Sequence, residues 1–185
     1  MWSRAEPTTF DTDYAGAATG IVTRVRFAWS PDALHALFEL AGAGLFTDTA
    51  RPIEAERERL YEEDCVELFV TPDGRDRDRY FEIEVGPFGH FFDLDVRKGK
   101  KADASFASGV RIGTLRDAAA RRAVIEMTIP SPEIKKALGD GARLYVGIYR
   151  MEGEKPRRYL AWSPPRTPKP SFHEPEAFGI VELEP

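Results

Sequence analysis

Alternating hydrophobic and polar positions run through most of this chain, and they are clearest in residues 60–96. Three runs in this segment, 65–70, 80–85 and 90–96, change character at nearly every residue, which is the period of a half-buried strand. Turn signals rich in proline and glycine separate the runs. We therefore predict a three-stranded antiparallel meander with one face in the core.

The same alternation predicts which side chains face away from the core. The outward set is Cys65, Glu67, Phe69, Tyr80, Glu82, Glu84, Phe91, Asp93 and Asp95. If the loop between the second and third runs has four residues, Val85 pairs with His90 and Glu82 lies opposite Asp93. Like charges opposed across a sheet repel each other, so an offset is expected.

Three offsets are open for this acidic face. The first is an arginine, from Arg75, Arg77 or Arg79; the second is a bound cation; the third is a polyhydroxyl ligand that donates to carboxylates. A solvated face with arginine partners is the simplest interpretation.

Strand patterns also fill most of the remaining chain. The further expected strands are 21–29, 33–41, 109–115, 123–129, 143–151, 157–163 and 178–183. Ser131 and Pro132 begin one short helix that ends at Gly139, and residues 42–60 form a long loop. About nine or ten strands with one short helix predict an all-β fold, an antiparallel β-sandwich of jelly-roll or immunoglobulin-like type, as a single domain over residues 1–185.

Composition narrows the function classes. A net charge of −5 and 31% charged residues give no basic surface for nucleic acid. The single cysteine, Cys65, excludes an internal disulfide and a cysteine-based metal site. No apolar run is long enough to span a membrane, so no membrane partner is expected. The start of the chain lacks a signal-peptide pattern, and we expect a cytoplasmic protein, or a secreted or periplasmic one if a leader has been removed.

A proline-rich segment lies near the C-terminal end. Residues 162–175 contain five prolines and cannot pair as a central strand. Such a stiff segment holds Trp162, Phe172 and His173 in fixed positions, either as a strap that seals the core or as part of a binding surface.

Motifs in both regions resemble the family 9 carbohydrate-binding modules and related DOMON-like β-sandwich domains. The matching residues are Asp64, Val66, Glu67, Leu68, Phe69 and Pro72; residues 80–85 with Pro87 and Gly89; and Trp162, Ser163, Pro164, Phe172, His173, Pro175, Phe178 and Gly179. The resemblance implies saccharide binding, attachment to an enzyme that degrades plant polysaccharides, and often structural calcium. It also implies a clamp of two tryptophans, whereas this chain offers only Trp2, Trp29 and Trp162. We expect no catalytic domain within residues 1–185.

The leading hypothesis is a non-catalytic domain that stacks a saccharide on aromatic rings and bonds its hydroxyls to acidic groups. The candidate ligand-binding residues are Trp162, Trp29, Tyr159, Glu82, Glu84 and Asp93. Asp64 and Glu67 are expected to orient loops or to contact calcium.

Two alternatives use other residues. A glycosidase would use a pair of carboxylates such as Glu82 and Asp93. A haem-binding sandwich would need axial ligands, and the available side chains are Met127, Met151, His35, His90 and His173.

Overall fold

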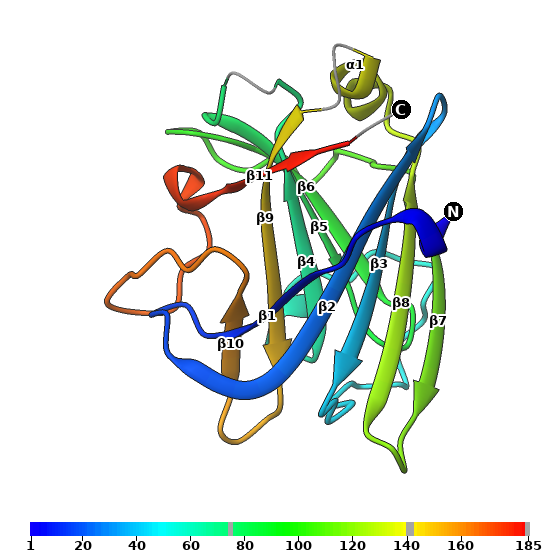
Figure 1. The fold of residues 1–185 in the computed structure, drawn as a ribbon, viewed down its shortest axis with the longest axis vertical. Coiled ribbons are helices and arrows are strands. Elements are labelled where there is room, and N and C mark those ends of the chain that lie inside the picture. The colour runs from blue at the N-terminus through cyan, green and yellow to red at the C-terminus, as the bar shows by residue number, and fades with distance from the viewer. Residues whose placement is uncertain (74–75, 140–142, 184–185) are drawn as a thin grey trace.

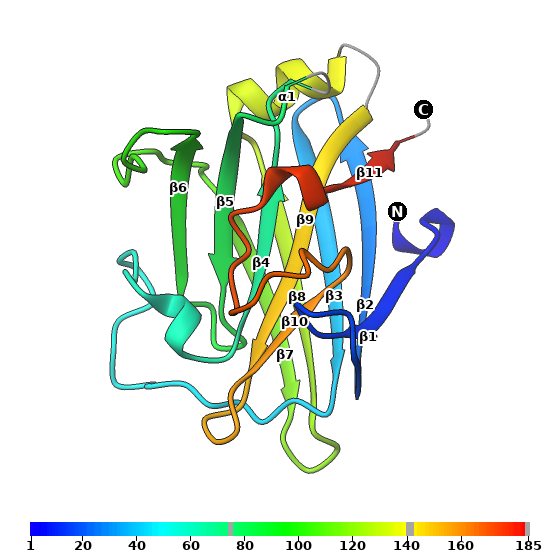
Figure 2. The ribbon, with the colours of Figure 1, turned by 90° about the vertical axis from the view of Figure 1, so that its left-hand side faces the viewer.

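Two antiparallel sheets packed face to face make up the fold of the computed structural model, which describes residues 1–73, 76–139 and 143–183 (Figures 1 and 2). Sheet A has the strand order β1 (Thr8–Thr12), β2 (Ala18–Ser30), β3 (Ala33–Ala41), β8 (Arg122–Ile129) and β7 (Arg111–Asp117). Sheet B has the order β10 (Arg158–Ala161), β9 (Arg143–Glu152), β4 (Cys65–Val70), β5 (Arg79–Val85) and β6 (Phe91–Arg97), and β11 (Gly179–Glu182) also pairs with β9.

This architecture confirms the predicted β-sandwich with one short α-helix. The helix, α1 (Pro132–Gly139), begins and ends where its capping signals predicted. Strand β1 was not predicted, and β2 begins earlier than its pattern indicated. Gly74 and Arg75, which belong to a predicted turn and to the arginine candidates, lie outside the described residues.

Apolar side chains pack in two separate layers. Between the sheets, alternate residues such as Phe38, Ile83 and Ile125 form the main core and are fully buried. A second cluster covers the outer face of sheet B, where Phe69 and Tyr149 are fully buried beneath the chain that follows β10. Sheet B is therefore covered on both faces, which explains why every residue of β4 is buried.

The hairpin between β5 and β6 differs from the prediction by one residue. Val85 pairs with Phe91, not with His90, and Gly86 donates a backbone hydrogen bond to the His90 carbonyl at 2.8 Å. The pairing thus continues through Gly86 and leaves a three-residue turn in which Gly89 adopts a φ of 94°.

A one-residue shift moves every side chain of a strand to the other face of the sheet. The predicted faces of β6 are therefore wrong. Asp93 and Asp95 point between the sheets, and Phe92, Leu94 and Val96 share the outer face with the glutamates of β5.

Three short 3₁₀ helices complete the described structure: η1 (Trp2–Arg4), η2 (Leu60–Glu62) and η3 (Pro175–Ala177). Between β3 and η2 the long predicted loop contains no strand or helix. No helix among the described residues has the length and apolar character needed to cross a membrane.

Candidate functional site

Acidic and hydrophobic side chains share the outer face of sheet B. Strand register places Tyr149, Glu67, Glu84 and Phe92 in one row across β9, β4, β5 and β6. The adjacent row runs through Gly147, Phe69, Glu82 and Leu94. Each row therefore brings carboxyl groups between hydrophobic neighbours.

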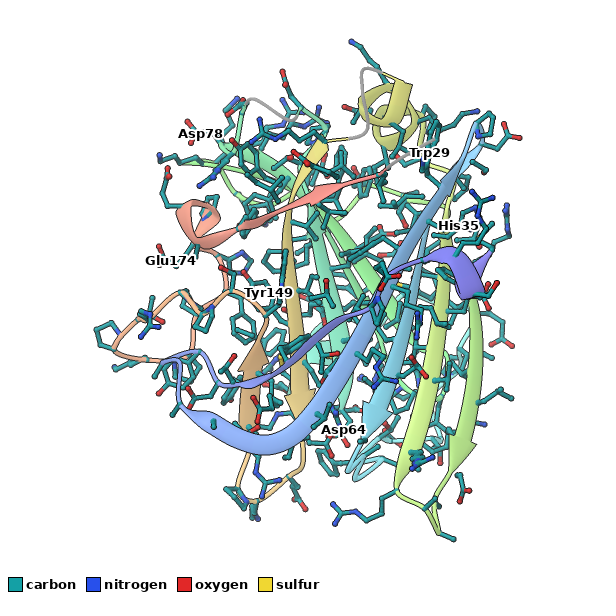
Figure 3. All side chains as sticks on the ribbon, in the orientation of Figure 1. Trp29, His35, Asp64, Asp78, Tyr149 and Glu174 are labelled. Atoms are coloured by element: carbon teal, nitrogen blue, oxygen red, sulfur yellow. The ribbon has the colours of Figure 1, made fainter. Side chains whose placement is uncertain are left out.

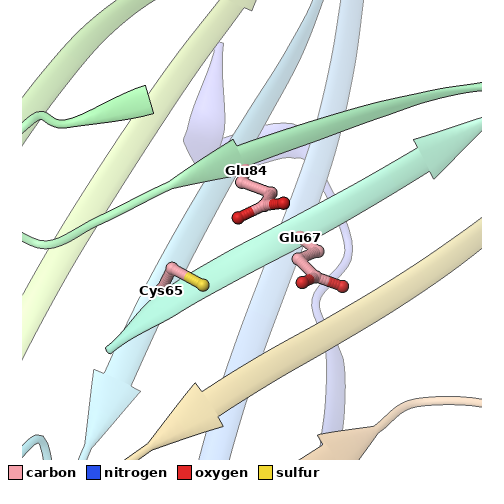
Figure 4. A group of neighbouring side chains, drawn as sticks. All are labelled: Cys65, Glu67 and Glu84. Carbon is pink, nitrogen blue, oxygen red and sulfur yellow. The ribbon is translucent and has the colours of Figure 1, made fainter. Parts of the chain in front are cut away.

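The three glutamates of these rows, Glu67, Glu82 and Glu84, are called the carboxyl cluster below. Each is at most 4% exposed, although glutamate is almost never fully buried without a partner. Figure 4 shows that Glu67 and Glu84 project from neighbouring strands on the side that also carries Cys65. Potential ligand atoms of Cys65, Glu67 and Glu84 lie within 4.8 Å of one another.

Burial and mutual repulsion make these carboxyl groups hard to ionise. Loss of hydration raises the pKa of Glu82 from 4.5 to about 7. Desolvation, followed by the neighbouring carboxylates, holds the pKa values of Glu67 and Glu84 well above their ordinary value. The backbone amide of Tyr61 donates to Glu84 and opposes this shift.

Among the described arginines and lysines, none forms an ion pair with the carboxyl cluster. Arg79 bonds Asp95 and Glu133, and Arg77 lies over the Tyr145 ring and donates to the Glu176 carbonyl. Arg157 lowers the pKa of Glu67 from a distance, but its own donors bond to Asp64 and to the carbonyls of Tyr61, Glu63 and Gly153. Arg79 therefore offsets Asp95, one of the acids of the predicted face, whereas neither Arg77 nor Arg79 offsets the carboxyl cluster.

The proline-rich segment, residues 162–175, forms one border of this face and is called the strap below. Phe172 stacks on Tyr149 with ring centroids 4.0 Å apart, and the His173 ring shares a 2.8 Å hydrogen bond with the Tyr80 hydroxyl. Gly147 makes room for the Tyr149 ring, since a Cβ at that position would lie 2.6 Å from it. Figure 2 shows this segment crossing in front of sheet B, with η2 at the lower end of the same face.

The predicted site residues divide between the faces of the sheets. Glu82, Glu84 and Tyr159 share the outer face of sheet B, where Tyr159 makes an edge contact with Phe172. Asp93 lies on the opposite face and accepts hydrogen bonds from the Ser108 amide at 3.1 Å and hydroxyl at 2.5 Å. The structure thus separates Asp93 from Glu82.

The two tryptophan candidates also lie away from the cluster. Trp29, on β2 (Figure 3), and Trp162, directly after β10, both pack against the core between the sheets. The Trp162 ring lies flat against Gly179, where a Cβ would come within 2.4 Å of it. Gly179 in the family-like motif therefore provides space for Trp162.

Two further residues belong to the face and were not selected as ligand-binding residues from the sequence. Glu67 lies directly between Tyr149 and Glu84, and Phe92 ends the same row. The alternation of the first run already directed Glu67 outward. Phe92 was assigned inward because of the incorrect hairpin register.

The described residues that come nearest to a metal site do not match calcium. Cys65, Glu67 and Glu84 offer two carboxylates and a thiol, whereas calcium takes six to eight oxygen ligands. Asp64 already accepts backbone hydrogen bonds from Phe46 and Gly153 and pairs with Arg157. Its role here is to orient loops, and structural calcium stays a prediction.

The structure does not support the residues named for the two alternative functions. Glu82 and Asp93 cannot act as a carboxylate pair across one substrate, because they lie on opposite faces of sheet B. Met127 is enclosed in the main core, and His35 is on the outer face of sheet A, where it bonds Thr128. His90 is buried and bonds the Arg51 carbonyl, so these haem-ligand candidates do not converge.

A hollow of about 310 Å³ lies on the outer face of sheet A and is a second surface to consider. Its lining is Val22, Arg24, Glu39, Leu40, Ala41, Arg122, Ala123 and Val124. It contains no aromatic ring, and Arg24 pairs with Glu39. The hollow therefore lacks the stacking surface that the outer face of sheet B provides.

Comparison with known proteins agrees with the fold and with the motifs. The family model described as "Carbohydrate family 9 binding domain-like" matches residues 1–185. The chain belongs to this family. No significant match is found among curated proteins.

Solved structures share the fold at low sequence identity. A crystal structure from Bacteroides uniformis ATCC 8492, described as a "putative carbohydrate-binding protein", has a TM-score of 0.78 and 18% identity, over 98% of this chain and 88% of that chain. A family 9 carbohydrate-binding module from Caldicellulosiruptor kristjanssonii, in complex with cellotriose, has a TM-score of 0.69 and 16% identity, over 99% and 84% of the two chains. A complex of such a module from that organism with glucose has a TM-score of 0.66 at 16% identity, over 99% of this chain and 86% of that chain.

Proposed function

We propose that this family 9 domain is a non-catalytic saccharide-binding domain and that its sugar lies against the outer face of sheet B. The observation that carries the proposal is the carboxyl cluster, whose hydrogen-bond acceptors lie among aromatic rings and form no ion pair with any described arginine or lysine. A sugar presents hydroxyl donors around its edge and apolar C–H groups on its faces. The hydroxyls can therefore donate to the carboxyl cluster, and the C–H groups can pack on the aromatic rings.

The ligand would approach over β5 and β6. Phe92 and Leu94 are half-buried at the ends of the two rows, and Tyr61 on η2 is 45% exposed. The rings of Phe92 and Tyr61 are suited to contact a pyranose face, while Glu82 and Glu84 accept hydrogen bonds from its hydroxyls. Trp29 and Trp162 are assigned to packing in this proposal, and Tyr159 to support of the strap.

The family relationship supports the same assignment. Its solved members include modules bound to cellotriose and to glucose, which are neutral glucose-based sugars. We infer a similar class of ligand here, and we infer that the domain works beside a carbohydrate-active enzyme. No acid and nucleophile pair is needed for that role, because binding alone concentrates the enzyme on its polymer.

Titration calorimetry tests the proposal directly. We expect glucose, cellotriose or xylotriose to bind with a dissociation constant below about 1 mM, equivalent to more than about 4 kcal/mol of binding free energy. Glu82→Gln should weaken that binding, because an amide is a poorer acceptor than a carboxylate. Asp93→Asn is the matched control on the opposite face of the same sheet and should leave binding unchanged. No binding of any of the three sugars would overturn the proposal.

A further inference from the structure

The carboxyl cluster differs from three of the four other buried acids among the described residues; the fourth, Asp93, bonds only Ser108. Asp95 bonds Arg79 and Arg97, Asp64 pairs with Arg157, and Glu152 pairs with Arg150 at 2.6 Å. A positive charge thus accompanies these three buried carboxylates. The members of the carboxyl cluster have no such partner among the described residues.

Two oxygens of the cluster also lack hydrogen-bond partners. These are Glu82 Oε2 and Glu84 Oε2, and both are inaccessible to solvent. An unpaired buried acceptor is costly, and an unpaired buried carboxylate is more costly still. The nearest basic group, His173 Nδ1, lies 3.9 Å from Glu82 Oε2 and already bonds Tyr80.

The remaining neighbours do not supply a charge either. Tyr80 and Tyr149 are neutral phenols whose pKa values burial raises further, and Glu174 on the strap adds negative potential. The Cys65 thiol is also held protonated, since burial and the adjacent glutamates raise its pKa. Among the described cations, Arg157 acts on Glu67 only from a distance, and its donors bond to η2 and to Asp64.

We propose that the site selects saccharides that carry a protonated primary amine, the class of hexosamines with a free amino group. This inference rests on the proposed saccharide-binding function and specifies its ligand. An ammonium group has three donors and one positive charge, and it can pair with the facing carboxylates of Glu67 and Glu84 or with the free oxygen of Glu82. The sugar ring would then extend over Phe92 and Leu94.

Related sugars lack one or more of these features. A neutral hexose offers hydroxyl donors but no charge, so the carboxyl groups must share protons instead. N-acetylation removes the charge and adds bulk beside buried rings. A uronic acid brings another negative charge to the cluster, and like charges in a poorly hydrated site repel each other strongly.

Proton exchange gives the proposal a distinct signature. A bound ammonium replaces the protons that the cluster holds, so amine binding should release protons to the buffer. Affinity should rise as the pH increases from 5 towards 7, because Glu82 titrates at about 7 and gains its negative charge over this range. Near and above a pH of about 8 the ligand's own amine loses its proton and affinity should fall.

The test is calorimetry at pH 7 with glucosamine, glucose, N-acetylglucosamine and glucuronic acid. We expect glucosamine to bind at least about tenfold more tightly than glucose, with glucuronic acid the weakest. Experiments in two buffers of different ionisation enthalpy should show proton release for glucosamine alone.

Substitutions in the carboxyl cluster test whether it causes the preference for glucosamine over glucose. Glu84→Gln and Glu82→Gln should each reduce the ratio of glucosamine to glucose affinity, whereas Glu126→Gln, on the outer face of sheet A, should leave that ratio unchanged. Circular dichroism of each variant establishes that it is folded. Equal affinity for glucose and glucosamine would overturn this inference and leave the proposed function standing. If none of the four sugars binds but cellotriose or xylotriose does, this inference fails alone; if those two also fail to bind, the proposed function fails with it.

Discussion

Glu67 and Glu84 face each other directly across the β4–β5 pair, on the outer side of sheet B. Two carboxylates in this position repel, and their burial removes the water that would screen them. The protein therefore holds a destabilising arrangement in the middle of an otherwise well-packed face. Groups that lower stability in this way are typical of binding sites, where a ligand later provides the missing partner.

The carboxyl cluster should make the protein less stable as the pH rises. Its folded pKa values lie above those of the unfolded chain, so between pH 4.5 and about 7 the native state holds more protons than the unfolded state. The stability that the protonated carboxyl groups contribute is therefore present at low pH and is lost as the pH rises from 4.5 to about 7. For Glu82 alone the loss is on the order of 3 kcal/mol, at about 1.4 kcal/mol per pKa unit.

Urea unfolding of the wild type and of Glu84→Gln at pH 5.5 and pH 8 measures this effect. The variant should gain stability relative to the wild type at pH 8 and little at pH 5.5, since an amide cannot ionise. Glu54→Gln, at an exposed position in the loop between β3 and η2, serves as the control and should not change the pH dependence. A Glu84→Gln protein with the wild-type pH profile would contradict the account.

The strap should depend on one aromatic stack. Phe172 is 7% exposed and lies parallel to Tyr149, with an interplanar angle of 7°. Phe172→Ala should cost about 3–5 kcal/mol if the site does not collapse, because it removes a large buried ring. Limited proteolysis should then cleave the variant within residues 163–174.

Ile53→Ala is the control for this experiment. Ile53 is 48% exposed, and its truncation should change stability by no more than about 0.5 kcal/mol. If Phe172→Ala is as stable and as protease-resistant as Ile53→Ala, the strap is held by other contacts.

Arg150 links the two sheets from within the core. Its side chain is fully buried, pairs with Glu152, and donates to Thr23 and to the carbonyls of Val22 and Ala41. Arg150→Ala would leave Glu152 buried without its cation, and we expect a loss of about 3–5 kcal/mol in the free energy of unfolding.

An exposed pair on the same strand provides the comparison. Arg143 pairs with Glu182 at the surface, and Arg143→Ala should cost less than about 1 kcal/mol. Similar losses for the two variants in chemical denaturation would show that Arg150 does not have the structural role assigned to it.

Local alternation was sufficient to predict most strands and the outward direction of Glu67, Glu82 and Glu84. It could not determine the β5–β6 register, because a four-residue loop and a three-residue turn closed by Gly86 and His90 fit the same letters. That difference of one residue moved Asp93 to the opposite face and Phe92 to the site. Turn geometry, not hydrophobic pattern, decided both positions.

The roles of the tryptophans also depended on contacts between distant segments. Trp162 is in a motif that favours ligand stacking, but β10 and β11 lie beside the same strand and bring Gly179 against its ring. No sequence period reveals that both short strands pair with β9. The sequence likewise could not show that Arg77 and Arg79 bond Glu176 and Asp95 and do not reach the carboxyl cluster.

The central claim is that saccharide binds to the outer face of sheet B. Amide chemical-shift mapping by NMR during titration with glucose or glucosamine tests this most directly. We predict that the largest shifts fall on β4, β5 and β6, at Glu67, Glu84 and Phe92. Shifts confined to the outer face of sheet A, around Arg24, Glu39 and Val124, would contradict the claim.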